Sequence, residues 1–258
     1  TITGNSAEIG GGGMKTVSSS SVNLENVIIT ENYTSSEIGS GYYSETDNTD
    51  TLKNVIIANN TGGGYGAVST SSYTYFENVL ITGNDGGLWS RQGSPSLKNV
   101  TITGNTGYGF FANGPSNTGS WPSLTNCIIW DNSTGNIELS SASVTLTYSD
   151  IQGGWEGTGN INADPLFIDA TNDDYHLSDY SPAIGAGTAT GAPTTDIEGN
   201  PRPNPEGSNP DMGAYENALG SPANAPPTIT SISNVSILED ASEQTVNMAG
   251  IGDGDASL

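Results

Sequence analysis

Positive charge is scarce in this sequence. Five lysines and arginines face 28 aspartates and glutamates, which gives a formal net charge of −23. Such a chain repels phosphate backbones and anionic lipid surfaces, so we expect neither nucleic acid nor membranes as partners. The acidity suits a secreted protein in a saline, calcium-containing medium, where carboxylate oxygens can bind Ca²⁺. Charge that only keeps the surface solvated is the favoured explanation, so Ca²⁺ stays an open cofactor.

Cysteine and long apolar runs are also nearly absent. The single cysteine, Cys127, excludes an intrachain disulfide, and its apolar surroundings predict a buried side chain. No stretch is apolar and long enough to cross a bilayer, and no basic-then-apolar signal segment opens the chain. Because Thr1 already falls inside a repeat, we expect the chain to be part of a longer precursor.

Turn-forming residues and an internal repeat are abundant. The 35 glycines and 13 prolines favour many turns over long helices and predict an all-β class. The repeated segments are TITGN, LENVIITEN, LKNVIIANN, FENVLITGN, LKNVTITGN and LTNCIIWDN. The asparagines that close them are 27, 28, 24, 21 and 27 residues apart: Asn5, Asn32, Asn60, Asn84, Asn105 and Asn132. Constant strands joined by loops of varying length are typical of a parallel β-helix.

Alternation within each repeat predicts which side chains point inward. The expected core columns are Val27 and Ile29, Val55 and Ile57, Val79 and Ile81, Val100 and Ile102, and Cys127 and Ile129. A second asparagine row comprises Asn26, Asn54, Asn78, Asn99 and Asn126. We predict that both asparagine rows form turn ladders, because asparagine tolerates left-handed backbone and its amide can bond to the next coil. A catalytic or metal-binding role for them is much less favoured.

A second strand is expected in each coil after the closing asparagine, usually behind glycines. Its predicted inward residues are Met14, Tyr42, Leu88, Phe110 and Ile137. The neighbours then point outward: Lys15, Tyr43, Trp89, Phe111 and Glu138, followed two residues on by Val17, Glu45, Arg91, Asn113 and Ser140.

At this point the chain resembles known families. The Leu-x-Asn-Val-x-Ile-x-x-Asn repeat over residues 1–152 resembles the pectate-lyase-like superfamily, which implies a right-handed parallel β-helix. Residues 153–217, with NADPLFIDATNDDYHLSDYSPAIGAGT, TDIEGNPRP and DMGAYE, resemble the choice-of-anchor Q region and predict a C-terminal cap of strands and loops. That resemblance implies an extracellular or cell-surface bacterial protein.

The remaining residues divide into a linker at 218–226 and a segment at 227–258 that resembles the start of a bacterial immunoglobulin-like or cadherin-like repeat. About 30 residues cannot bury a core of their own, so we expect a truncated domain. Asp253 and Asp255 could ligate Ca²⁺ in an intact module, although solvated side chains are the simpler expectation.

In the resembled superfamily, sugar chains lie along the outer face of one sheet. The corresponding face predicts an aromatic stripe of Tyr43, Trp89 and Phe111, flanked by Arg91, Lys15 and Glu45, which could orient hydroxyls or pair with uronate carboxylates. The alternative is that loops cover these aromatics, or that the register is off by one and they are core.

Catalysis is left open by the sequence. A lyase needs a cation or metal beside the uronate and a base for the neighbouring proton. Lys15 would lie about three coils, roughly 14 Å, from Arg91, which is too far to act on one sugar. Asp47, Asp50 and Asp85 fall in loops of uncertain position, and Glu45 with Asp85 is an unsupported hydrolase pair. Glycan binding is therefore the preferred function, with a polysaccharide lyase or glycoside hydrolase and a structural stalk as alternatives.

Two further features are expected to be structural. His176, near Asp173, Asp174 and Asp179, should continue a short strand in the cap rather than act in catalysis. An outward apolar row requires cover, which residues 160–217 could provide within a monomer or a second chain could provide in a dimer; its members are Ile28, Ile56, Leu80 and Ile128. Intramolecular cover is the preferred prediction.

Overall fold

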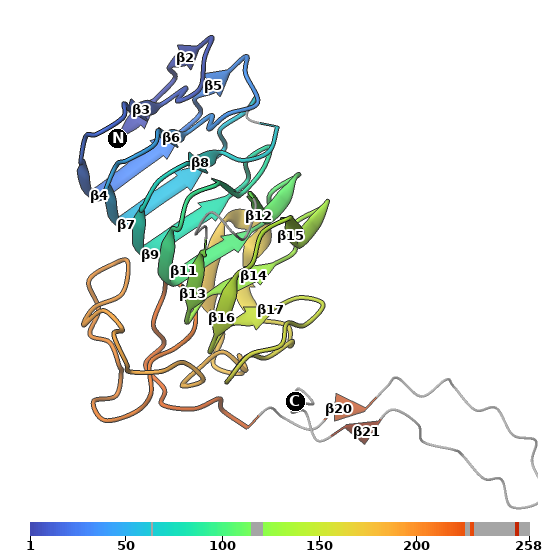
Figure 1. Cartoon of the computed structure of the whole chain (residues 1–258). Helices are drawn as coiled ribbons and strands as arrows, with labels where there is room; N and C mark the ends of the chain where they lie inside the picture. The colour runs from blue at the N-terminus through green and yellow to red at the C-terminus, as the bar shows by residue number, and fades with distance from the viewer. Residues whose placement is uncertain (63, 115–120, 225–227, 230–250, 253–258) are drawn as a thin grey trace, which may run out of the picture.

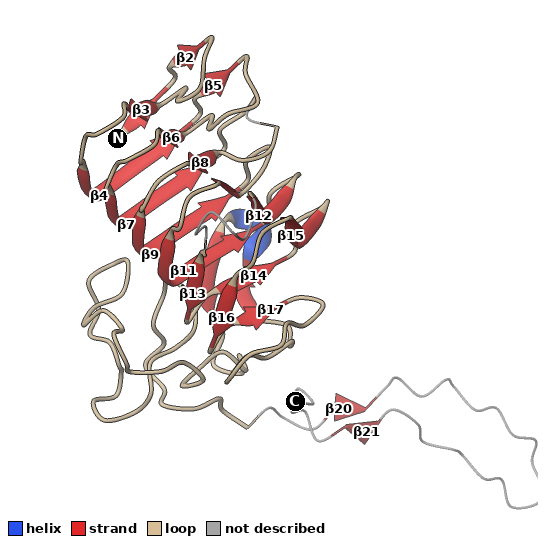
Figure 2. Cartoon of the chain, in the orientation of Figure 1, coloured by secondary structure: helices blue, strands red, loops and turns tan. Residues whose placement is uncertain are grey.

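The chain folds into a parallel β-solenoid of about six turns with almost no helix, which confirms the predicted all-β class. The computed structural model describes residues 1–62, 64–114, 121–224, 228–229 and 251–252. Figure 1 shows the strands stacked in chain order along the solenoid, and Figure 2 shows how completely strands and loops account for the fold.

Two long sheets run the length of the solenoid. The nine-stranded sheet contains β1 (Ile2–Thr3), β4 (Asn23–Thr30), β7 (Thr51–Ala58), β9 (Tyr75–Thr82), β11 (Ser96–Thr103), β13 (Ser123–Thr125) and β16 (Thr145–Thr147) in that order, extended by β14 (Ile128–Trp130) and β17 (Asp150–Ile151). The six-stranded sheet contains β3 (Met14–Thr16), β6 (Tyr42–Ser44), β8 (Val68–Thr70), β10 (Leu88–Arg91), β12 (Tyr108–Asn113) and β15 (Gly135–Ser140). A short third sheet pairs β2 (Ser6–Ala7) with β5 (Tyr33–Thr34).

The core columns follow the predicted register. Val55 pairs with Val27 on one side and with Val79 on the other, and Tyr42 pairs with Met14 and Val68. Stacking removes the inward side chains from water, as the alternation predicts. Cys127 is fully buried in this core, and burial raises the pKa of its thiol to about 12.

Both asparagine rows form the predicted ladders. Within the buried closing row, the amide nitrogen of Asn60 donates to Oδ1 of Asn84 at 3.0 Å, and that of Asn84 donates to Asn105 at 3.0 Å. In the second row, Asn54 has a left-handed φ of 52° and its amide donates to Asn26. The closing row also satisfies buried backbone groups, since the Asn60 backbone N–H donates to Asn84 Oδ1 and the Asn60 amide donates to the Ile29 carbonyl. Both rows join neighbouring coils.

The segment after the last coil folds back over the nine-stranded sheet, as predicted for the cap. It contains an antiparallel pair, β18 (Phe167–Asp169) and β19 (Asp174–Leu177), and the 3₁₀ turn η2 (Ala170–Asn172). Ile128 packs against Leu177, Ala183, Ile184 and Met212, while Leu80 packs against Tyr175, Ala214 and Tyr215.

One member of the apolar row departs from the prediction. Ile28 remains 42% exposed, because the cap's apolar residues pack on Ile56, Leu80 and Ile128 and leave the earlier coil uncovered. The expectation that the cap covers the whole row was wrong at this end.

Polar groups dock the cap on the second asparagine row. The Asn99 amide donates to the carbonyls of Asp211 and Gly213, and the buried Arg202 donates to Asn78 Oδ1 at 2.9 Å. Arg202 also pairs with Glu216 at 2.8 Å. The sequence predicts these asparagines only as turn formers. The structure shows that Asn78 and Asn99 also bind the cap.

The TDIEGNPRP and DMGAYE segments serve this docking. Both carboxylate oxygens of Asp211 accept backbone N–H groups, from Gly185 and Asn217, and Asp196 accepts those of Glu198, Asn200 and Glu216. Carboxylates that accept backbone N–H groups in this way hold the loops of the cap together.

The C-terminal segment contributes one short antiparallel pair, β20 (Thr228–Ile229) with β21 (Ile251–Gly252). Asp253 and Asp255, which could ligate Ca²⁺ in an intact module but are expected to be solvated, lie outside the residues that the structure describes. The division at residues 152, 217 and 226 and the immunoglobulin-like assignment stay predictions. No helix in the described part of the chain is long and apolar enough to cross a membrane.

Candidate functional site

The outer face of the six-stranded sheet carries the predicted site residues in one row. Strand pairing aligns Lys15 with Tyr43, Tyr43 with Ser69, Ser69 with Trp89, and Trp89 with Phe111. The predicted register is therefore confirmed, and an off-by-one register is excluded. Whether these residues contact a ligand stays a prediction.

The aromatic residues of this row form a stack rather than an open platform. The rings of Trp89 and Phe111 lie nearly parallel, 17° apart, with centroids separated by 6.0 Å. Tyr65, from the loop before β8, packs on both rings at 4.8 and 5.7 Å. Trp89 is only 8% exposed, and its indole N–H donates to Asn113 Oδ1 at 2.9 Å. The alternative that a loop covers the aromatics thus holds for much of Trp89.

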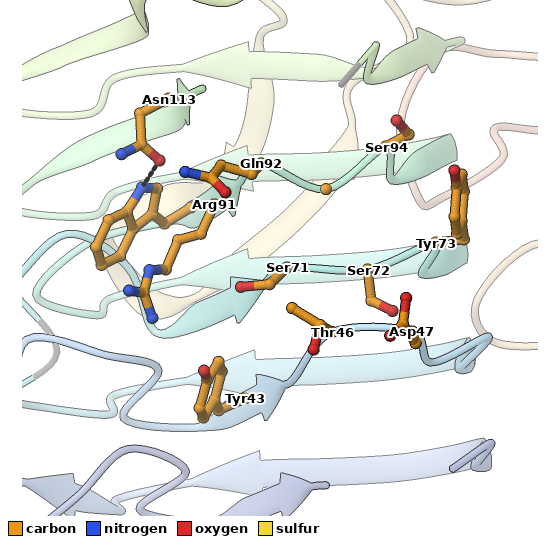
Figure 3. A pocket seen from close by; sticks show the side chains of 12 residues that line it. Tyr43, Thr46, Asp47, Ser71, Ser72, Tyr73, Arg91, Gln92, Ser94 and Asn113 are labelled. Atoms are coloured by element: carbon orange, nitrogen blue, oxygen red, sulfur yellow. Dashed lines mark hydrogen bonds between the residues drawn. The ribbon is translucent and has the colours of Figure 1, made fainter. Parts of the chain in front are cut away.

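A cavity of about 630 Å³ opens beside this stack. Its wall combines Tyr43, Trp89 and Arg91 from the predicted site and Asn113 from β12 with residues of the turns that follow the strands: Thr46, Asp47, Ser71, Ser72, Tyr73, Gln92, Gly93 and Ser94. Figure 3 shows Arg91 extending from β10 toward Tyr43, with Tyr73 and Asp47 on the opposite side. The lining is mostly hydroxyl, amide and aromatic, which suits a ligand that is itself amphipathic.

Arg91 is the unusual cation of this surface. Its guanidinium carbon lies 4.7 Å from the centre of the Trp89 ring, and none of the described residues accepts a hydrogen bond from it or forms an ion pair with it. The other four cations all have acceptors: Lys15 with Glu45, Lys53 with Glu77, Lys98 with the Gly191 carbonyl, and Arg202 with Glu216. The ring orients the guanidinium while its N–H donors remain available in the cavity.

Lys15 and Glu45 satisfy one another at the edge of this face. Their charged atoms are 2.6 Å apart, and Glu45 also accepts from the backbone and hydroxyl of Ser18. The hydrogen bond from Lys15 lowers the pKa of Glu45. A carboxylate held ionised in this way is poorly suited to act as a general acid, and neither residue lines the cavity.

The three loop aspartates are separated by the fold. Asp50 is buried and accepts from Thr16, Tyr42 and Ser44, so it is part of the core. Asp85 accepts from the Gly62 backbone, and Asp47 is the one acidic residue among those that line the cavity. Among the described residues, no group of three or more histidine, cysteine or carboxylate side chains is arranged to hold a metal ion.

His176 lies in β19 of the cap, as predicted. Its Nδ1 is 2.6 Å from Asp174, its Nε2 is 3.2 Å from Glu198, and its ring packs on Tyr215 with centroids 4.2 Å apart. Burial opposes protonation, but the hydrogen bonds to both carboxylates outweigh it and raise the histidine pKa. Asp173 and Asp179 bond elsewhere, to Tyr175 and Asn217. This arrangement ties two cap segments together.

The sequence did not single out Tyr73, Gln92 or Thr46, although they line the cavity. They lie in the turns between the two sheets, where loop length changes from coil to coil. A signal was present for Thr46 and Gln92, since their turns directly follow strands whose outward residues, Tyr43 and Trp89, the sequence predicts. Tyr73 follows β8, for which the sequence analysis predicted no outward residue.

Comparison with known proteins found no match: no family model, no curated protein and no solved structure matches the chain.

Proposed function

We propose that this chain is a secreted or cell-surface β-helix protein that contacts extracellular polysaccharide through the cavity beside Tyr43, Trp89 and Arg91. The observation that carries the proposal is Arg91, held over an aromatic ring in a cavity without an acceptor from the described residues. Removing the Arg91 guanidinium from water costs free energy unless an acceptor on a ligand or solvent replaces the hydrogen bonds that it loses.

The chemistry of the lining favours sugars. Hydroxyl and amide side chains can exchange hydrogen bonds with sugar hydroxyls, and the exposed parts of Tyr43 and Tyr73 can pack on the apolar faces of sugar rings. Arg91 can donate to a hydroxyl or form a bidentate pair with a uronate carboxylate. The strongly negative overall charge argues against nucleic acid as the ligand.

The extracellular location and the bacterial origin rest on the family resemblance. The monomeric state is supported by the cap, which covers most of the outward apolar row from within the same chain. These remain parts of the proposal.

Catalysis is the second candidate. It has one observation in its favour, namely that Asp47 shares the cavity with Arg91 and could serve as a base next to a bound uronate. A hydrolase would need two carboxyl groups facing one bond, and among the described residues that line the cavity Asp47 is the one carboxylate. Binding without cleavage is therefore the stronger reading, and a stalk without any ligand is the third.

The test is to incubate the purified chain, with and without Ca²⁺, with neutral and uronate polysaccharides and to follow retention, polymer size and unsaturated products. Retention of intact polymer is the expected result. Shortening with unsaturated ends would identify a lyase, and shortening without them a hydrolase. No retention and no cleavage on any polymer would contradict the proposal and leave the stalk.

A further inference from the structure

A second group of aromatic side chains lies outside the predicted stripe. Tyr73 is 57% exposed and Trp121 is 60% exposed, and Tyr75 beside them is also exposed. Tyr73 and Trp121 belong to the turns that lead from the six-stranded sheet into the nine-stranded sheet, and Tyr75 is the first residue of β9. In the described part of the chain, no other aromatic ring packs on Tyr73 or Trp121, so these side chains contribute little to the core.

The register places two of these rings in one line. The Ser94 backbone donates to the Ser72 carbonyl, so Ser94 lies opposite Tyr73, and the Trp121 backbone donates to the Ser94 hydroxyl. The adjoining pairs of Ser96 with Tyr75 and with Ser123 fix the same alignment. Tyr73 and Trp121 are thus equivalent residues two coils apart, with the small side chain of Ser94 between them.

The distance between Tyr73 and Trp121 indicates which kind of polysaccharide would fit both side chains. Two coils correspond to roughly 10 Å, twice the strand spacing of about 4.8 Å. This is close to the length of two sugar units in an extended, β-1,4-linked chain, whose ring faces recur along a straight line. A helical α-linked chain turns its rings away from such a line. Aromatic side chains pack well on sugar ring faces, because each offers an apolar surface of similar size.

Tyr73 also connects this line to the cavity, because its ring forms part of the wall opposite Arg91 (Figure 3). We infer that Tyr73 and Trp121 form a strip that binds an extended β-1,4-linked polysaccharide parallel to the solenoid axis, while the cavity takes a side group of the same chain. This inference rests on the proposed function and deepens it: the strip recognises the backbone linkage, and Arg91 recognises the substituent.

The experiment compares Tyr73→Ala, Trp121→Ala and the double variant with wild type. Tyr33→Ala is the matched control, since Tyr33 is similarly exposed on β5, away from the strip. Retention is measured on amorphous β-1,4-glucan, β-1,4-mannan and chitin, with soluble starch and dextran as α-linked polymers. Each single variant should lose several-fold in retention on a β-linked polymer and the double variant at least tenfold, with Tyr33→Ala unchanged and no retention on starch.

Two outcomes would overturn the inference while the proposed function stands. One is a double variant that binds like wild type while Arg91→Ala has lost retention; the other is equal retention on starch and β-linked polymers. Failure of wild type to bind any polysaccharide would instead contradict the proposed function itself. Unfolding curves for all variants show whether a loss reflects binding or folding.

Discussion

The outer faces of the two long sheets differ in how their polar groups are used. Over the nine-stranded sheet, the cap buries Asn78, Asn99 and Arg202, and each has a partner within the chain. Over the six-stranded sheet, Arg91 points into a cavity without a described acceptor. One face is completed by the protein's own residues, whereas the other leaves donors available. The comparison separates polar residues that maintain the fold from those that can bind a ligand.

Removal of one partner of the buried ion pair should have the largest effect. Arg202→Ala leaves Glu216 buried without its cation and removes the bond to Asn78, so we expect a loss of about 3–5 kcal/mol in the free energy of unfolding. Urea unfolding measures it, with Lys98→Ala as a control near zero. A loss below about 1 kcal/mol would show that the cap docks through apolar contacts alone.

The apolar row offers a matched comparison between covered and uncovered positions. Leu80→Ala should cost about 2–5 kcal/mol, because Leu80 is buried under Tyr175 and Ala214. Ile28→Ala should cost under about 1 kcal/mol, because its side chain remains 42% exposed. Equal losses in urea unfolding would mean that Ile28 is covered in solution, and sedimentation would then reveal a second chain.

The junction between coils and cap should be sensitive to pH. Asp150 is fully buried, one of its carboxylate oxygens has no partner within the described residues, and burial raises its pKa to about 7. The folded chain therefore holds this proton more tightly than the unfolded chain. The resulting stability is complete below about pH 4 and is lost as the pH rises through about 7.

Asp150→Asn should remove this dependence. Between pH 5 and pH 8, the variant should lose on the order of 2–3 kcal/mol less stability than wild type, as measured by urea unfolding at each pH. Part of the slope should persist in the variant, because burial and the nearby Glu216 also raise the pKa of Asp211 to about 7. Identical slopes in the two proteins would contradict the assignment.

Sequence reasoning succeeded where a single periodicity decides the outcome. Alternation placed Ile57 and Tyr42 inside and Tyr43 and Trp89 outside, because a shift of one residue would have exposed every core column. The asparagine ladders followed for the same reason, since residues at equivalent positions of stacked coils must meet.

The remainder depended on contacts that no local pattern encodes. Tyr65 covers Trp89 from a loop whose length is particular to its coil, and Tyr73 reaches the cavity from a turn. The docking of Arg202 on Asn78 joins residues 124 positions apart. The cap covers the apolar row as far as Ile56 and leaves Ile28 exposed. The sequence of the apolar row does not show where this cover ends, because it depends on how the cap folds.

The smallest effect on stability should accompany the clearest loss of binding. Arg91→Ala should change the free energy of unfolding by no more than about 1 kcal/mol, since none of the described residues accepts a hydrogen bond from the guanidinium and its contact with the Trp89 ring is worth about 0.5–1 kcal/mol. Retention of wild type and Arg91→Ala on the polysaccharide that wild type binds best is the most direct test, with Lys98→Ala as the charge-matched control. A loss of at least tenfold for Arg91→Ala alone is predicted. Undiminished retention by a well-folded Arg91→Ala protein would contradict the assignment of this cavity as the binding site.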